Sequence, residues 1–219
     1  MSTLNYYISC EGETEEWYFS WLQDQINKDQ RVKNKVKLYH NKGRNATDFA
    51  KSNQGIFNPC KCFYMLQDVE SYSEEHIKRL HSSCDDIKKA SQILRKCQFS
   101  LAYSNFTFEV WMIAHKKSVP SIVDRRTYYQ EINKAFHESF ISNADYKKER
   151  NFHKLLEKLT LDDVINFALP ECQRIRTYNE ANHLSSIRRY KGLVYFLNNP
   201  DSNVDQIVCT ILQDSGIIQ

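Results

Sequence analysis

The chain has 219 residues, of which 41% are hydrophobic and 13% are aromatic, and its formal net charge is +3. These values exclude an intrinsically disordered chain, and the length suits one elaborated domain or two small ones. The weak positive charge is compatible with a nucleic-acid partner but does not by itself indicate one.

The first half of the chain alternates strand and helix patterns. Apolar or alternating runs predict strands at residues 4–9, 36–40, 62–66 and 98–103. Helical spacing predicts helices that begin near Thr14 and Ser73, whose hydroxyls suit caps, and further helices at residues 46–51, 85–96 and 106–115. Asn58-Pro59 breaks the chain before the third strand. This alternation predicts an α/β fold with a parallel sheet flanked by helices.

The second half has a different pattern. Helices are predicted at residues 126–140, 152–159, 162–167, 171–197 and 203–212, and no strand signal of comparable strength is present. We therefore expect an α/β domain at residues 1–117 and a mainly helical region at residues 118–219 packed on it, or one integrated domain that contains both.

The absence of membrane and export signals and the pattern of cysteines both indicate a cytoplasmic protein. No apolar run approaches the ~20 residues of a membrane span and no signal peptide is recognisable, so we expect a cytoplasmic protein with no membrane partner. Seven cysteines are present, and only Cys60 and Cys62 are close together, without the second pair that a zinc site needs. Buried thiols of a cytosolic protein are the better interpretation.

Acidic residues follow two of the predicted strands directly. Glu11 and then Gly12 follow the first strand, and Asp68 and Glu70 follow the third. If these strands are parallel neighbours, three carboxylates meet at one sheet edge, and an extended segment would turn Asp68 and Glu70 to the same side. Such a group suits Mg²⁺ or Mn²⁺, which prefer hard oxygen ligands. The alternative for each acid is a solvated loop position.

Two further acids are candidates. Glu15 lies one helical turn after Glu11, and Glu109 lies among bulky apolar residues early in a predicted helix. If Glu109 is buried, it needs an arginine or lysine partner. The alternative for both is an acid that favours a helix start. His115, at the end of the same helix, suits a structural role better than a catalytic one.

Basic residues accompany tyrosines in the second half, at Tyr146-Lys147-Lys148 and at Arg188-Arg189-Tyr190. This pairing is typical of contacts with phosphates and bases, although solvated helix faces also carry such runs. Together with metal-binding carboxylates it indicates phosphodiester chemistry. A P-loop, a dinucleotide fingerprint, a zincin motif and a nucleophile elbow are absent from the sequence.

Five loose motifs occur in order along nearly the whole chain: Glu11-Gly12-Glu13-Thr14-Glu15 with Tyr18-Phe19, Asp68-Val69-Glu70, Ser104-Asn105 with Phe108-Glu109-Val110-Trp111 and His115, Tyr146-Lys147-Lys148, and Asn199-Pro200-Asp201-Ser202-Asn203-Val204. In their order and spacing they resemble the RloB-like family. The family usually has aspartate where Glu70 stands, often another acid at Ser71, and proline at Phe106.

RloB-like proteins are similar to Toprim domains, the metal-binding α/β fold of topoisomerases, primases and certain nucleases. The resemblance implies that Glu11 acts as a general acid/base or metal ligand and that Asp68 and Glu70 bind Mg²⁺. The family is associated with bacterial phage defence by abortive infection, often beside an ATPase partner.

Three functional hypotheses remain open. The first is a Mg²⁺-dependent nuclease for DNA or RNA, in which Glu15 and Glu109 support Glu11 and the basic residues Lys147, Lys148, Arg188 and Arg189 hold the nucleic acid. The second is a non-catalytic nucleic-acid-binding or sensor subunit of an ATPase-containing defence complex. The third is a metal-dependent nucleotidyl or phosphoryl transferase that uses the same acids.

Overall fold

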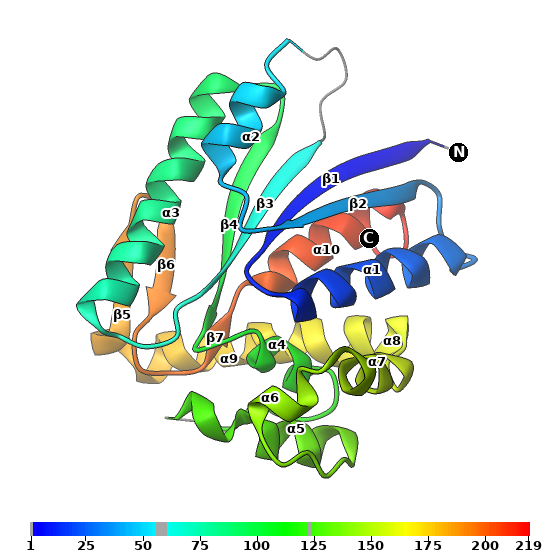
Figure 1. Ribbon diagram of the computed structural model, residues 1–219, viewed down its shortest axis with the longest axis vertical. Coiled ribbons are helices and arrows are strands. Elements are labelled where there is room, and N and C mark those ends of the chain that lie inside the picture. Colours follow the sequence, from blue (N-terminus) through cyan, green and yellow to red (C-terminus); the bar gives the residue numbers. More distant parts are fainter. Residues whose placement is uncertain (1, 56–60, 122–123) are drawn as a thin grey trace.

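A five-stranded sheet forms the centre of the molecule in the computed structural model, which describes residues 2–55, 61–121 and 124–219 (Figure 1). The strand order is β2-β1-β3-β4-β7, in which the first four strands are parallel and β7 is antiparallel to β4. The strands of this sheet are β1 Thr3–Cys10, β2 Lys35–Lys42, β3 Cys62–Asp68, β4 Gln98–Asn105 and β7 Asp201–Ser202. The predicted α/β fold with a mostly parallel, helix-flanked sheet is confirmed.

Helices alternate with the first strands and then follow one another along the chain. They are α1 Glu13–Lys28, α2 Ala46–Ser52, α3 Glu74–Ile93, α4 Glu109–Ala114, η1 Arg125–Thr127, α5 Tyr128–Phe136, α6 Asn143–Tyr146, α7 Glu149–Glu157, α8 Leu161–Asp163, the π-helical η2 Val164–Ala168, α9 Leu169–Asn182, η3 Leu184–Ser186 and α10 Val204–Ser215. A second, two-stranded sheet pairs β5 Ile187–Tyr190 with β6 Leu193–Phe196.

The two faces of the main sheet are buried by different helices. Side chains alternate along a strand, so Tyr64 of β3 joins the core beneath α1 and α10, while Phe63 joins the core beneath α2 and α3. The first core continues into the helices at the carboxyl ends of the strands, where it includes Trp111 of α4 and Leu155 of α7. Figure 1 shows these helices gathered at that end of the sheet.

The register brings the ends of β1, β3 and β4 together. Ser9 of β1 pairs with Met65 of β3, and Asp68 at the end of β3 pairs with Ser104 of β4. The expectation that the first and third predicted strands are parallel neighbours is therefore correct. Residues that follow β1 and β3 consequently leave the sheet at one edge.

The predicted break between two helices near Asp85 is wrong, because α3 runs without interruption from Glu74 to Ile93. Asp86 in this helix accepts a hydrogen bond of 2.5 Å at its Oδ2 from the backbone N–H of Ala46 and so caps the neighbouring helix α2. Ser73 caps α3 as expected, accepting from the N–H of His76 at 3.3 Å.

The predicted long helix at residues 171–197 is also wrong in its second part. Helix α9 ends at Asn182, and β5 and β6 then form an antiparallel hairpin. Its two-residue turn, Lys191-Gly192, has positive φ angles of +49° and +97°. The second half of the chain is therefore not wholly helical, since it contains this hairpin and β7.

Smaller differences concern element ends. Helix α1 begins after Gly12, and the Thr14 hydroxyl donates to Glu15 instead of capping the helix. The segments predicted at 162–167 and from 171 onwards follow one another through the π-helical η2, just before Pro170, which lacks an N–H for the helical pattern. Asn58-Pro59 and Cys60 lie outside the described residues, and the domain boundary expected near residue 117 stays a prediction.

Candidate acidic site at the sheet edge

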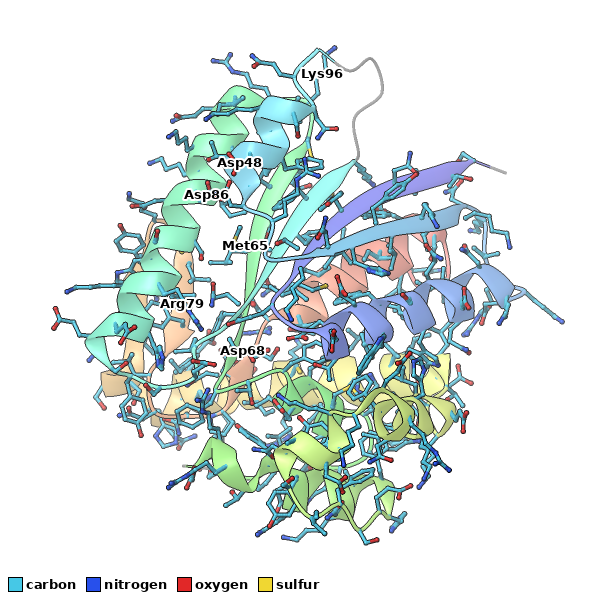
Figure 2. The ribbon with its side chains drawn as sticks, in the orientation of Figure 1. Asp48, Met65, Asp68, Arg79, Asp86 and Lys96 are labelled. Atoms are coloured by element: carbon cyan, nitrogen blue, oxygen red, sulfur yellow. The ribbon has the colours of Figure 1, made fainter. Side chains whose placement is uncertain are left out.

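Glu11 connects the end of β1 to the end of β3. Its Oε2 accepts a hydrogen bond of 2.6 Å from the backbone N–H of Asp68 and one of 3.2 Å from Gln67 Nε2. Its Oε1 accepts a bond of 3.0 Å from Arg79, which reaches across from α3. Figure 2 shows Asp68 at this edge of the sheet and Arg79 on the neighbouring helix α3. The carboxylate therefore fixes the geometry of the β3 terminus.

The environment of Glu11 raises its pKa. Burial is the largest cause, and it outweighs the opposite effects of the Asp68 N–H and the Arg79 charge. The nearby charge of Glu70 adds to the increase, while Lys147 opposes it. A carboxyl group whose pKa is raised in this way can hold or release a proton closer to neutral pH than an ordinary glutamate.

Asp68 is at the centre of the acidic cluster, which we define as Glu11, Glu15, Asp68 and Glu109. Burial raises the pKa of Asp68 well above its ordinary value, and the charges of Glu15, Glu11 and Glu109 raise it further. Lys147 acts in the opposite direction. Within the described residues no donor forms a hydrogen bond to the Asp68 carboxyl group, so the protein itself does not fully compensate the charged form of this group.

Glu15 belongs to the cluster because α1 starts close to the sheet. Its side chain is only 4% exposed and accepts a hydrogen bond of 2.9 Å from the Thr14 hydroxyl. Burial raises its pKa, and the charge of Glu109 contributes to the increase. A Cβ at Gly12 would lie 3.0 Å from Glu15 Oε2, so the glycine permits this close approach.

Glu109 is buried in the first turn of α4, with 3% of its surface exposed. Its Oε1 is 2.7 Å from Lys147 Nζ and also accepts a hydrogen bond from the Tyr146 hydroxyl. Its Oε2 is buried and lacks a hydrogen-bond partner among the residues that the structure describes. The basic partner that a buried Glu109 requires is therefore Lys147, and one oxygen remains available to a ligand.

Glu70 has a different orientation from the one expected of an extended segment. Its backbone is left-handed, with φ +61°, and its carboxylate lies 2.8 Å from Arg125 and 3.2 Å from His76. Arg79 is 3.6 Å away. Burial alone would raise the pKa of Glu70, but Arg125 and Arg79 lower it below the ordinary value. Glu70 is thus already neutralised by basic side chains.

A cavity of about 260 Å³ connects the acids with basic residues of the second half. It is lined by Asp68, Glu70, Thr107, Glu109, Arg125, Arg126, Asn143 and Lys147. The acids come from the end of β3, the segment after it and the first turn of α4, and the cations come from η1 and the end of α6. Oxygen ligands for a cation and positive charges for an anion therefore line one cavity.

The sequence-predicted residues separate into two groups. The structure brings together Glu11, Glu15, Asp68, Glu109 and Lys147, as the hydrogen bonds, the ion pair and the mutual charge effects demonstrate. Lys148 instead pairs with Asp145 at 3.0 Å. Arg188 and Arg189 lie on β5, and none of the contacts between described residues joins them to the acidic cluster.

Several contacts of the site were not predicted. Gln67 and Arg79 hold Glu11, and Tyr146 shares Glu109 with Lys147. A polar Gln67 within an otherwise apolar strand was a usable signal, because a buried amide needs a partner. Arg79 had no such signal, since it is one of several charged residues on a long surface helix.

The side chains present fit a divalent cation in charge and in donor type. The unpartnered Glu109 Oε2 and the Asp68 carboxylate are hard oxygen donors in a region of excess negative charge. No three His, Cys, Asp or Glu side chains of the described chain are arranged as a ready metal site, however. By charge and donor type the candidate ligands are Asp68 and Glu109, with Glu15 beside them, and not Glu70, which is held by Arg125.

The fold and the site define an α/β protein with acidic side chains at the carboxyl edge of a parallel sheet. A family model described as RloB-like protein matches residues 6–211. The chain belongs to the RloB-like family. Comparisons with curated proteins and with solved structures gave no match. In the part of the chain that the structure describes, every helix is too short or too polar to cross a membrane.

Proposed function

We propose that this protein is a Mg²⁺-dependent, Toprim-type nuclease that cleaves phosphodiester bonds of DNA or RNA in bacterial antiphage defence by abortive infection. The observation that carries the proposal is the convergence of Asp68 and Glu109, with spare carboxylate oxygens, in a cavity that basic residues also line. Membership of the RloB-like family supports the defence role and an association with an ATPase partner.

The residues have separable roles in this proposal. Asp68 and Glu109, with Glu15 beside them, would hold Mg²⁺ or Mn²⁺, which stabilises charge on phosphoryl oxygens and activates water when bound. Glu11 orients the Asp68 backbone and is placed to accept or return a proton. Lys147 and Arg125 bind the phosphate backbone, because both line the cavity and carry charges that phosphates attract.

The decisive test is Asp68→Asn, which removes the central charge with little change of shape. We expect Mg²⁺-dependent cleavage of labelled single- and double-stranded DNA and RNA to fall at least about 100-fold. Wild-type protein should also gain thermal stability with Mg²⁺, and the variant should lose this gain. Asp48→Asn, at an exposed position of α2, is the matched control and should behave as wild type. Unchanged cleavage by Asp68→Asn would refute the proposal.

A second candidate function is a non-catalytic nucleic-acid-binding or sensor subunit of an ATPase-containing defence complex. The observation that favours it is the neutralisation of two expected metal ligands, since Arg79 pairs with Glu11 and Arg125 pairs with Glu70. In that case Mg²⁺ leaves the melting temperature unchanged, while nucleic acid still binds and Lys147→Glu weakens this binding. A Mg²⁺-dependent rise in melting temperature favours the nuclease.

A further inference from the structure

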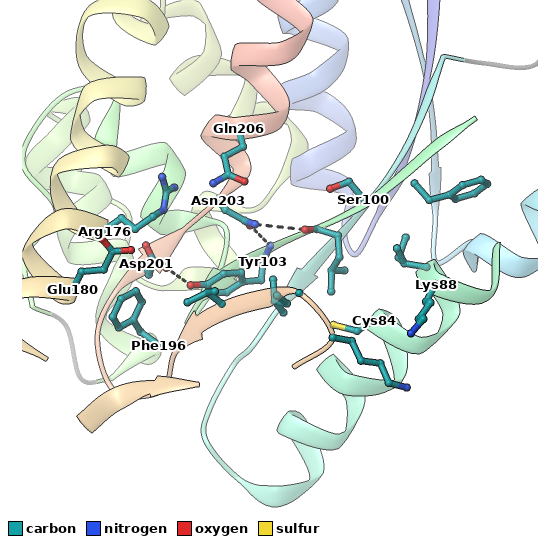
Figure 3. A pocket seen from close by; sticks show the side chains of 17 residues that line it. Cys84, Lys88, Ser100, Tyr103, Arg176, Glu180, Phe196, Asp201, Asn203 and Gln206 are labelled. Carbon is teal, nitrogen blue, oxygen red and sulfur yellow. Dashed lines mark hydrogen bonds between the residues drawn. The ribbon is translucent and has the colours of Figure 1, made fainter. Parts of the chain in front are cut away.

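A larger cavity lies beside β4, away from the acidic cluster, with a volume of about 700 Å³ (Figure 3). It is enclosed by α3, β4, the β5–β6 hairpin, α9 and the start of α10, and its labelled side chains include Cys84, Lys88, Tyr103, Arg176 and Asp201. Neither the sequence patterns nor the proposed nuclease assigns it a role. Its volume lies within the range of small-molecule sites.

Asp201 places a buried acceptor on the wall of this cavity. The residue is 1% exposed, and its Oδ2 accepts a hydrogen bond from the Tyr103 hydroxyl. Its Oδ1 is buried without a hydrogen-bond partner among the described residues. The charge of Arg176 acts on Asp201, but its guanidinium donates hydrogen bonds to Ser202 O at 2.9 Å and to Asp205 at 2.6 Å. An unpaired carboxylate oxygen of this kind can accept a hydrogen bond from a ligand.

The remaining lining includes apolar and basic side chains, besides polar residues and the acid Glu180. Phe99, Leu101, Leu193 and Phe196 form an apolar wall. Lys88 and Lys191 contribute positive charge, and Lys191 is already paired with Asp85. Lys88 is exposed and forms no ion pair with any residue that the structure describes. The cavity therefore offers an apolar surface, one buried acceptor and one uncommitted cation.

We propose that this cavity binds a nucleoside phosphate whose base carries an exocyclic amine. The base lies against the apolar wall, its amine donates a hydrogen bond to Asp201 Oδ1, and its phosphate lies near Lys88. A flat heterocycle with a donor at its edge and an anionic group at the other end matches these three features together. This proposal is independent of the proposed nuclease activity.

The position of the cavity suits a regulatory ligand. Asp201 and Ser202 form β7, which pairs with Asn105 and Ser104 of β4. Ser104 in turn pairs with Asp68 of β3. The nucleotide site and the acidic cluster are thus separate, but they are connected through adjacent strands.

The test is calorimetric titration of the full chain with CMP and UMP, with EDTA present so that no divalent cation carries the phosphate to the acidic cluster. Wild-type protein should bind CMP about tenfold more tightly than UMP, because only CMP offers an amine to Asp201. Cytidine and inorganic phosphate should each bind more weakly than CMP. AMP, which also carries an amine, should bind in the same way as CMP.

Two variants separate a binding role from a structural one. Lys88→Glu should weaken CMP binding about tenfold, whereas Lys89→Glu, an exposed neighbour outside the cavity lining, should leave it unchanged. Asp201→Asn should bind UMP more tightly than CMP. In this variant Tyr103 donates to the amide oxygen, so the amide N–H₂ faces the ligand. There it can donate to the uracil carbonyl. Melting curves establish that each variant is folded.

The proposal is overturned if wild-type protein binds none of the nucleotides. It is equally overturned if Lys88→Glu and Lys89→Glu bind CMP alike, or if CMP and UMP bind with equal affinity to both wild type and Asp201→Asn. Loss of activity in Asp68→Asn leaves these outcomes unaffected, because Asp68 does not line this cavity.

Discussion

The imidazole of His115 is fully buried between α4 and α1. Its Nδ1 donates a hydrogen bond of 2.8 Å to the Trp111 carbonyl, and its Nε2 accepts one of 3.0 Å from the Tyr18 hydroxyl. Both ring nitrogens are therefore used by a neutral ring, and burial lowers the pKa of His115 from 6.5 to about 4. The residue has the structural role that the sequence favoured, and it is not a charged group at the end of α4.

The lowered pKa of His115 predicts a loss of stability in acid. Above pH 6.5 the ring is neutral in both folded and unfolded chains, so its contribution to the free energy of unfolding is complete. Between pH 6.5 and 4 mainly the unfolded chain takes up the proton, and this contribution is lost. Stability should fall by about 3 kcal/mol as pH decreases from 6.5 to 4. Urea titrations across this range, compared with His115→Gln, measure the difference in slope.

Carboxyl groups of the protein also titrate in this pH range. The quantity to compare is therefore the difference between the variants in the slope of stability against pH. His153→Gln is the control, because His153 is half exposed on α7. It should retain the wild-type slope. An equal slope for His115→Gln and wild type would contradict the prediction.

Some residues of the candidate site were predictable from the sequence pattern, and others were not. Glu11 and Asp68 were predictable because each directly follows a strongly apolar strand, and the ends of parallel strands converge. The need of Glu109 for a basic partner was predictable from its apolar neighbours, although Lys147 itself was not identified as that partner. The inward placement of Arg79 was not predictable, because it depends on how α3 is rotated against the sheet.

At the scale of elements, Asn105 fixes the chain between the hairpin and β7. Its Nδ2 carries two hydrogens and lies within hydrogen-bonding distance of three backbone carbonyls, those of Phe196 at 2.8 Å, Leu197 at 3.2 Å and Asn199 at 2.7 Å. The side chain is fully buried at the end of β4. One amide therefore connects the last parallel strand to the end of the hairpin and the segment after it.

Asn105→Ala should destabilise the protein by about 3 kcal/mol, because it leaves several buried carbonyls without their donor. Hydrogen exchange should accelerate first in β6 and β7. Denaturant titration measures the free energy of unfolding, and Asn182→Ala, which removes an exposed amide from α9, should change it by less than about 0.5 kcal/mol. Similar values for both variants would show that the Asn105 contacts contribute little.

The hairpin was missed for a physical reason. Residues 187–197 mix arginines, tyrosines and aliphatic residues in an order that fits a helix as well as short strands, and each strand has only four residues. The usable signal was Lys191-Gly192, because a two-residue turn that ends in glycine is typical of a hairpin. Contacts with α3 stabilise the result: the Tyr190 ring stacks on His81 with centroids 3.8 Å apart, and Lys191 pairs with Asp85.

At the scale of the whole molecule, one apolar core includes both halves of the chain. It contains Tyr6 and Ile8 of β1 together with Phe152 of α7 and Ile211 of α10. Trp17 of α1 also packs against Phe152, with ring centroids 5.8 Å apart. A continuous core predicts cooperative unfolding, because neither half keeps its apolar surface covered without the other.

Differential scanning calorimetry should therefore give one transition for the full chain, with equal calorimetric and van 't Hoff enthalpies. Scans at two heating rates control for irreversible aggregation. Two resolved transitions would instead indicate that residues 1–117 and 118–219 unfold as separate domains. The outcome thus decides the domain organisation that the sequence left open.

The ion pair between Glu109 and Lys147 also has a consequence for the order in which the protein is made. Synthesis proceeds from the N-terminus, so Glu11, Asp68 and Glu109 leave the ribosome well before Lys147. A nascent chain that ends between Glu109 and Lys147 has the acids of the site but lacks the cation that partly compensates their charge. The acids of the candidate site therefore receive this compensating cation only after α6 has been added to the chain.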